Sequence, residues 1–332
     1  MTHTIWKSTR RWLPGLLISL VVIAVILYFV DLQRFLDAIR SASLPLLLVV
    51  LALAFVWLGV RGIVWRTILK EQAAYRDVFF SLCEGYLLNN FLPFRMGEIG
   101  KAFLLSRKSG LGFMAVLPTI IIERILDLVY AAAILLGAVP FVVGASGAGR
   151  IALIIGIVMV IGLVTLFFMT RNREKGLDLF RRLTTRWPGF QAQGAKFLDS
   201  LFSGLSILTD GWLFGRVLLW MTFNWAIAIF QFYILILAFF PQSTPLWSLF
   251  GQGAVALGNA IPSLPGALGT FEGAFVGAIT LLSGDQSTAL AAALTSHLVN
   301  YLSTGIIGLY ALSSEGETLL GIYRQLRRKE AG

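Results

Sequence analysis

Two stretches of the chain share the pattern Asn-x-x-Pro-x-x-x-Gly-x-x-Gly: NFLPFRMGEIG at residues 90–100 and NAIPSLPGALG at residues 259–269. An offset of 169 residues separates every shared position. Both stretches interrupt long apolar runs, and such broken segments in corresponding places indicate a transporter of two related halves with its site where the halves meet. The shared positions are Asn90, Pro93, Gly97 and Gly100, and Asn259, Pro262, Gly266 and Gly269.

The composition indicates a membrane protein with several spans. Of the 332 residues, 57% are hydrophobic and only 13% are charged, too few to give a soluble domain its polar surface. The single cysteine, Cys83, excludes an intrachain disulfide. The two histidines, His3 and His297, are far apart and show no metal-ligand spacing. We therefore expect neither a metal site nor a cofactor.

The apolar runs predict an all-α polytopic membrane protein with about six transmembrane helices and two re-entrant broken-helix hairpins. Six runs are long enough to cross roughly 30 Å of hydrocarbon, and Pro and Gly break two others. An amphipathic stretch at 197–208 fits a helix in the membrane interface. The spans are Leu13–Val30, a retained signal anchor, Leu44–Ile68, Gly112–Val143, Arg150–Thr170, Leu213–Phe240 and Ala289–Leu312; the broken segments are Val78–Phe94 and Trp247–Leu282.

We expect one integral membrane domain over residues 1–332, built as an inverted repeat. Its halves lie at about 44–170 and 213–312 and are joined by a basic cytoplasmic loop and interfacial helix at 171–212. In this arrangement the first broken segment enters the membrane from the cytoplasm and the second from outside.

Basic residues set the expected orientation. Under the positive-inside rule they place both termini in the cytoplasm, with the chain in the cytoplasmic (inner) membrane. The net charge of +10 comes from segments beside the spans, where it meets anionic lipid headgroups, so we expect no nucleic-acid partner. Five segments hold 21 of the 27 Lys and Arg residues: 1–12, 61–77, 95–108, 171–190 and 321–332.

Charged side chains inside the spans are candidates for binding, because each costs roughly 2.5 to 3.5 kcal/mol near the bilayer centre and needs a partner or a wet cavity. In one cluster Arg124 is expected to reach Asp127 at i,i+3 and to neutralise both Asp127 and Glu123, leaving one excess negative charge. The alternative is a structural ion pair that fixes helix packing. Glu272 stands alone among glycines and needs a cationic partner or a proton.

The first motif joins a chain break to charged residues. A helix that begins near Gly97 would direct its free N–H groups into the site, where Arg95 and Lys101 would bind phosphate and Glu98 would meet a cationic headgroup or a proton. The alternative is that Arg95 and Lys101 anchor the hairpin at the cytoplasmic headgroups. His297 is expected to pack or to hydrogen-bond, with a proton relay as the alternative.

Three pieces of sequence occur in order along the chain: Asn89–Pro93 with Gly97 and Glu98, then Glu123–Asp127, then Pro265–Glu272. Together they resemble the flippase-like membrane domain of the lysylphosphatidylglycerol synthase family, over about residues 16–312. The resemblance implies a domain that moves a phospholipid, aminoacylated in bifunctional members, between leaflets, without the cytosolic aminoacyltransferase domain. Family members commonly carry Arg near the position of His297, which leaves the headgroup preference open.

We expect the chain to move a phospholipid or a polyprenyl-linked lipid between leaflets through a polar cleft between its halves. Two alternatives stay open: a membrane partner of a separate lipid synthase or glycosyltransferase, and an enzyme of lipid or cell-envelope glycan synthesis. No catalytic grouping compels the latter, so we expect no enzyme activity. The expected substrate-binding residues are Asn90, Arg95, Gly97, Glu98, Lys101, Glu123, Arg124, Asp127, Asn259, Gly266, Gly269, Glu272 and His297.

The orientation yields a labelling prediction for a variant that lacks Cys83. Because the basic segments lie inside, Ala145→Cys should react with an impermeant thiol reagent from outside, and Gly176→Cys only from the cytoplasmic side. Labelling of Gly176→Cys from outside would contradict both the orientation and the opposite entry of the two motifs.

Overall fold

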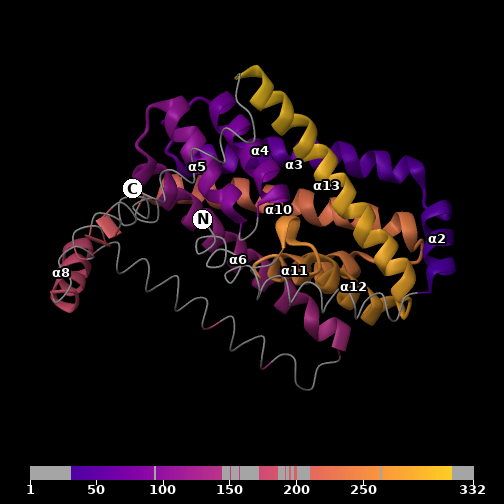
Figure 1. Ribbon diagram of the computed structural model, residues 1–332. Coiled ribbons are helices and arrows are strands. Elements are labelled where there is room, and N and C mark those ends of the chain that lie inside the picture. Colours follow the sequence, from indigo (N-terminus) through magenta and orange to yellow (C-terminus); the bar gives the residue numbers. More distant parts are fainter. Residues whose placement is uncertain are drawn as a thin grey trace, which may run out of the picture.

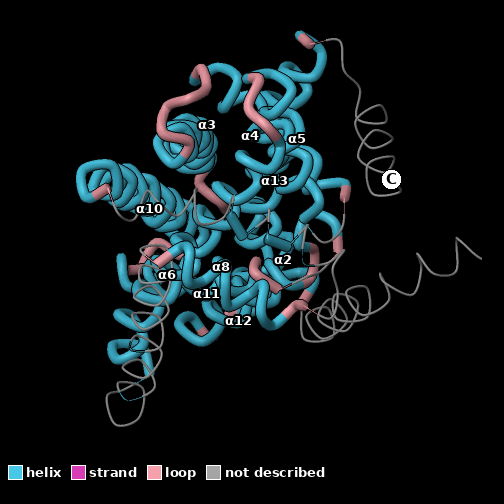
Figure 2. Tube along the Cα trace, turned by 90° about the vertical axis from the view of Figure 1, so that its left-hand side faces the viewer, coloured by secondary structure: helices cyan, strands magenta, loops and turns pink. Residues whose placement is uncertain are grey.

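The structure is a computed structural model that describes residues 31–92, 95–143, 172–185, 210–261 and 264–315, together with the single positions 150, 157, 191, 194, 195, 198 and 199. Within this part every regular element is a helix, and short loops join the helices (Figures 1 and 2). The expected all-α class is therefore confirmed. The expected spans at 13–30 and 150–170 and the interfacial helix at 197–208 lie outside the described residues, apart from a few single positions.

Five described segments are long and apolar enough to cross a membrane, and four of them are spans that the sequence predicts. These four are the long helices α3, α6, α10 and α13. The fifth, Pro265–Ser283, belongs to the second broken segment and joins the short turn η3 to α12. The elements are α2 (Leu32–Ser41), α3 (Leu44–Ile68), α4 (Tyr75–Phe91), α5 (Met96–Ser109), α6 (Phe113–Val143), α8 (Arg173–Leu183), α10 (Gly211–Phe239), α11 (Pro245–Gly258), η3 (Pro265–Ala267), α12 (Thr270–Ser283) and α13 (Gln286–Ser314).

Local sequence explains where several helices begin and end. The side chains of Asp31, Asp210 and Asp285 accept backbone N–H groups at the starts of α2, α10 and α13, which satisfies donors that have no partner within the helix. Gly110 and Gly284 end α5 and α12 in the left-handed conformation that glycine adopts without steric cost. These signals separate the hairpin arms from the long helices that follow them.

Both broken segments fold as helical hairpins, α4–α5 (the first hairpin) and α11–α12 (the second hairpin). Their arms contain 17, 14, 14 and 14 residues. At 1.5 Å per residue no single α-helix of the hairpins exceeds about 26 Å, so among the described hairpin arms only the second arm of the second hairpin, which η3 extends to Pro265–Ser283, counts as a candidate span. The first hairpin continues to Ser109, well beyond the expected end at Phe94.

The first long helices of the two expected halves, α3 and α10, lie side by side and run antiparallel. The first hairpin therefore begins at one end of this pair and the second hairpin at the other, and the two hairpins lie toward opposite ends of the molecule (Figure 1). Contacts spread along the pair show the direction: Ser43 with Ala238, Val50 with Gln231, Trp57 with Asn224, and Glu71 with Arg216.

Each expected half contains the same order of elements: a long helix, a hairpin and a second long helix. The halves also exchange contacts, since α4 packs on α13 and α11 packs on α6. Glycine allows both close approaches: a Cβ at Gly308 would lie 2.9 Å from the Cys83 carbonyl oxygen, and one at Gly253 would lie 3.0 Å from Leu135 backbone atoms. An inverted repeat predicts this arrangement; the repeat boundaries themselves stay a prediction.

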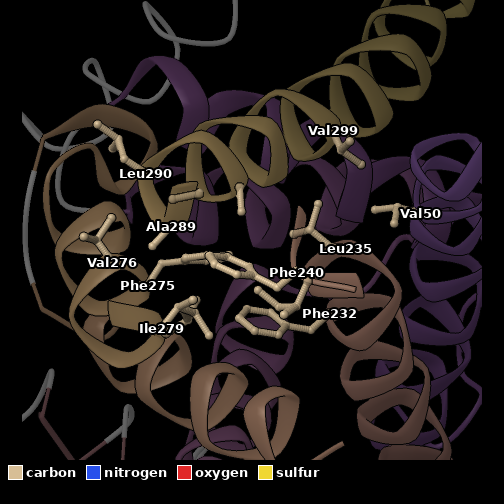
Figure 3. Close-up of a cluster of buried hydrophobic side chains, with 14 of the residues drawn as sticks. Val50, Phe232, Leu235, Phe240, Phe275, Val276, Ile279, Ala289, Leu290 and Val299 are labelled. Atoms are coloured by element: carbon tan, nitrogen blue, oxygen red, sulfur yellow. The ribbon is translucent and has the colours of Figure 1, made fainter. Parts of the chain in front are cut away.

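An apolar core joins the second hairpin to the long helices. Phe232 of α10 packs on Phe275 of α12 with ring centroids 4.9 Å apart, and Val50, Leu235 and Val299 come from α3, α10 and α13 (Figure 3). Burial of these side chains fixes the second hairpin against both halves of the chain.

The tip of the first hairpin gives a stability prediction. A Cβ at Gly97 would lie 2.0 Å from the Gly85 carbonyl oxygen, so even alanine forces α4 and α5 apart. We expect Gly97→Ala to cost about 1–3 kcal/mol of unfolding free energy. The matched control Gly305→Ala, in α13, meets no atom within 4 Å and should be neutral or stabilising by up to about 1 kcal/mol.

Thermal unfolding of the purified variants in detergent measures the difference. Equal unfolding temperatures for Gly97→Ala and Gly305→Ala would show that the two arms are not in close contact.

Candidate functional site

A cavity of about 540 Å³ lies between the connections of the two hairpins and the long helices. Eight of the thirteen expected site residues line it: Asn90, Arg95, Glu98, Arg124, Asp127, Asn259, Gly266 and His297. The other five, Gly97, Lys101, Glu123, Gly269 and Glu272, are outside the lining but lie in contact with residues of the same site.

The charged side chains at this cavity form a closed network of ion pairs, here called the ion network: Arg61, Glu98, Lys101, Glu123, Arg124 and Asp127. Its centre is Arg61 of α3, which sequence reasoning did not select. The Arg61 guanidinium lies 2.6 Å from Glu123 and holds both oxygens of Asp127, at 2.9 and 2.5 Å. Its side chain is only 2% exposed. Such bidentate contacts fix both the position and the orientation of a carboxylate.

Lys101 occupies a different place from the one expected. Its ammonium lies 2.8 Å from Glu123 and 3.1 Å from Glu98, and it faces the ring of Trp65 at 4.8 Å. The side chain is fully buried and does not line the cavity. The expectation that Lys101 binds a substrate phosphate is therefore wrong for this conformation, because the paired ammonium is screened from the cavity.

Arg124 contacts Glu98 and, at 3.3 Å, Asp127, but it does not neutralise Glu123 as expected. Arg61 and Lys101 perform that role. The network then contains three cations and three carboxylates, so the expected excess of negative charge is also wrong. Sequence counting missed the balance because Arg61 was assigned to a cytoplasmic flank, although a lone Arg in an apolar run is itself a signal of a buried partner.

Arg95 differs from the other cations of the site. It lines the cavity half-buried, and it makes no hydrogen bond or ion pair with the described residues. The helix α5 begins directly after it at Met96, as expected, so the backbone N–H groups of the first helical turn, which have no partner within the helix, follow Arg95 in the chain. Arg95 itself adopts a left-handed conformation with φ of 54°, which is costly for a side chain with a Cβ. This end of the cavity can hold an anion.

The second motif does not repeat the geometry of the first. Gly97 is a helical residue packed against Gly85, whereas Gly266 lies in η3 with φ of 69°, and α12 begins only at Thr270. Asn259 caps the end of α11, so an eleven-residue connection, 259–269, replaces the four-residue connection 92–95. Neither glycine leaves room for a side chain without a shift of its neighbours, since a Cβ at Gly266 would meet the Tyr301 hydroxyl at 1.9 Å.

Glu272 and His297 form a contact that the sequence did not pair. His297 Nδ1 contacts a carboxylate oxygen of Glu272, whose other oxygen accepts the Gly269 N–H at 2.7 Å. His297 Nε2 lies 2.8 Å from the carbonyl oxygen of Gly266. The predicted need of Glu272 for a partner is met by His297, and Gly269 has a capping role.

The remaining cavity wall is partly apolar. Val50, Ala54 and Leu235 line it together with Phe232, and uncharged polar groups such as Gln231 lie among them. A cavity with a cationic end and an apolar wall fits an amphipathic molecule. In the described ranges no group of three or more His, Cys, Asp or Glu residues is placed to hold a metal ion.

Comparisons with known proteins agree with the sequence resemblance. A family model described as lysylphosphatidylglycerol synthase TM region matches residues 12–308. The chain is 23% identical to glycosyltransferase AglD of Haloferax volcanii, over 93% of this chain but 55% of that protein, so it spans about half of that relative. It is 20% identical to a UPF0104 membrane protein of Methanothermobacter thermautotrophicus, over 88% of this chain and 90% of that protein. No solved structure matches it.

The ion network predicts that Arg61 is needed for folding. Arg61→Ala removes the guanidinium that pairs with Asp127 and Glu123 in a buried environment of low dielectric constant. Loss of one partner from a buried ion pair lowers the free energy of unfolding by about 3–5 kcal/mol. We expect a large fall in the yield of folded protein, partly restored by adding Asp127→Asn. The control Arg34→Ala, whose side chain is 73% exposed, should leave the yield unchanged.

Size-exclusion chromatography and thermal unfolding measure these yields. An Arg61→Ala variant as stable as the wild type would mean that water reaches the network and that the pairing is dispensable.

Proposed function

Since the chain belongs to the lysylphosphatidylglycerol synthase TM region family, we propose that it moves an anionic, phosphate-bearing lipid between the leaflets of the cytoplasmic membrane. The observation that carries the proposal is Arg95, a half-buried cation at the cavity that has no ion-pair partner among the described residues. A phosphate oxygen accepts hydrogen bonds from both a guanidinium and the N–H groups at a helix start. Arg95 and the beginning of α5 supply both kinds of donor.

The charge balance favours a phosphate over a cationic headgroup. The carboxylates that line the cavity, Glu98 and Asp127, are already paired with Arg124 and Arg61. An aminoacyl group would find no carboxylate without a cation in the described part of the cavity. The substrate class that fits is therefore a phospholipid or polyprenyl-linked phosphate without a basic headgroup.

The apolar wall and the two hairpins supply the rest of the mechanism. The lipid phosphate binds beside Arg95, while the acyl or prenyl chain follows the apolar wall of Val50, Ala54 and Leu235 toward the bilayer. Because the hairpins begin at opposite ends of the α3–α10 pair, movement of one half against the other exposes the same site to each leaflet in turn.

A second function is supported by one comparison. The match to glycosyltransferase AglD covers 93% of this chain, so a role as a membrane partner in lipid-linked glycan synthesis is the alternative proposal. Such a partner would bind the lipid without moving it between leaflets.

Reconstitution separates the two proposals. The purified protein is placed in vesicles with labelled phosphatidylglycerol, and an impermeant quencher reports the exposed leaflet. We expect faster exchange than in protein-free vesicles, and slower exchange of lysylphosphatidylglycerol. Lipid binding without exchange between leaflets would favour the partner role. Equal exchange rates for phosphatidylglycerol and lysylphosphatidylglycerol would contradict the phosphate site.

The role of Arg95 is tested in the same vesicles. Arg95→Gln removes a charge-assisted contact worth about 1.5–3 kcal/mol, so the apparent affinity for phosphatidylglycerol should fall by about 10- to 100-fold. Arg40→Gln, at an exposed position in α2, is the matched control and should exchange lipid at the wild-type rate. Unchanged affinity in Arg95→Gln would place the phosphate elsewhere.

A further inference from the structure

The imidazole of His297 faces two hydrogen-bond acceptors at once. Its Nδ1 contacts Glu272, and its Nε2 lies 2.8 Å from the Gly266 carbonyl oxygen. The second oxygen of Glu272 accepts the Gly269 N–H at 2.7 Å, which keeps the carboxylate in place. The side chains of His297 and Glu272 are only 7% and 5% exposed.

The hydrogen-bond partners of His297 determine how many protons the Glu272–His297 pair carries. The Gly266 carbonyl can only accept, so Nε2 carries a hydrogen. The contact between Nδ1 and the carboxylate also needs a hydrogen, carried either by Nδ1 as an imidazolium or by Glu272 as a neutral acid. Both forms are neutral as a pair, and both hold one proton more than a neutral histidine beside an ionised carboxylate.

Loss of that proton breaks one of the two contacts. A neutral imidazole has one N–H for two acceptors, so a nitrogen lone pair must then face either the Glu272 carboxylate or the Gly266 carbonyl. These contacts fasten the connection 259–269 to α13. Ala267 in that connection has φ of 61°, a left-handed conformation that costs free energy and persists only when neighbouring groups hold it.

We propose that the Glu272–His297 pair is a proton-binding site that is coupled to an anionic lipid in the cavity. The coupling rests on the proposed function, whereas the proton site does not. Without its proton the pair has a charge of −1 beside a cavity lined by His297, which repels a lipid phosphate. Proton and lipid therefore raise each other's affinity by the same factor. A lipid monoanion that crosses with one proton carries no net charge against the membrane potential.

The other groups around the ring do not replace this proton. Phe271 of α12 packs on the imidazole at a centroid distance of 4.8 Å, and Tyr301 of α13 packs on it at 4.5 Å. Among the described residues in contact with the ring, Glu272 and Tyr301 are the titratable ones, and a phenol keeps its proton below about pH 9. The remaining charged residues of the cavity wall come from α3, α5, α6 and the residue before α5: Arg61, Arg95, Glu98, Arg124 and Asp127.

Calorimetric titration with short-chain phosphatidylglycerol tests the coupling. Runs in buffers of different ionisation enthalpy count the protons taken up. Where the free pair is deprotonated, we expect close to one proton per lipid, and a dissociation constant that rises up to about tenfold per pH unit.

Glu272→Gln supplies the decisive variant. Its amide N–H can donate to His297 Nδ1, and its carbonyl can accept the Gly269 N–H, so every contact is satisfied without the extra proton. We expect no proton uptake in this variant. Its dissociation constant for phosphatidylglycerol should change by no more than about twofold across about pH 5 to 9. The control Glu84→Gln changes a buried carboxylate that pairs with Lys108 away from the cavity, and it should keep the wild-type pH dependence.

Wild-type binding with no proton uptake, or a wild-type pH dependence in Glu272→Gln, would overturn the coupling. If Glu272→Gln does not fold, the number of protons that the wild type takes up on binding lipid decides alone.

If phosphatidylglycerol binds at no pH, the proposed function fails, and thermal unfolding without lipid still tests the proton site. Loss of the shared proton breaks one of the two contacts of His297, so the wild type should lose stability relative to Glu272→Gln as pH rises. Identical profiles would reject the site.

Discussion

The charge balance of the ion network is the constraint on which the rest of the site depends. A buried charge that loses its partner costs several kcal/mol, so the three cations and three carboxylates hold α3, α5 and α6 in one arrangement. Because these six charged side chains pair with one another, Arg95 is the cation that stays available to a ligand in the described cavity. The network thus holds the helices in place, and in the proposed function the tip of the first hairpin binds the ligand.

The antiparallel α3–α10 pair places the two hairpins at opposite ends of the pair and beside the same cavity, as the proposed movement of lipid across the membrane requires. One hairpin begins at each end of the pair, and both hairpin connections reach the same cavity. The first connection contributes the cation, and the second contributes the Glu272–His297 pair through Gly266. The two halves therefore share an order of elements but supply different groups, and in the proposed function one group binds the lipid anion and the other the proton.

The sequence predicted the features that depend on neighbouring residues, namely the long helices and the breaks between the hairpin arms. Apolar length identified α3, α6, α10 and α13, and the breaks at Pro and Gly identified both hairpins. The ion-pair partners in the site were not predictable in this way, because they come from distant elements. Arg61 and Glu123 are 62 positions apart, and the pattern of apolar residues does not show that the two side chains meet. The two motifs have identical residues at these positions but different backbone conformations, since Gly97 is helical and Gly266 is left-handed.

The position of the lipid phosphate can be measured by electron cryomicroscopy of the protein in nanodiscs that contain phosphatidylglycerol. We expect phosphate density inside the cavity, within hydrogen-bond distance of the Arg95 guanidinium and beside the start of α5, with the lipid tail along the apolar wall. The ion network should keep the same pairs in the presence of lipid. A cavity that holds only water, with Arg95 turned outward to headgroups at the membrane surface, would rule out the proposed phosphate site.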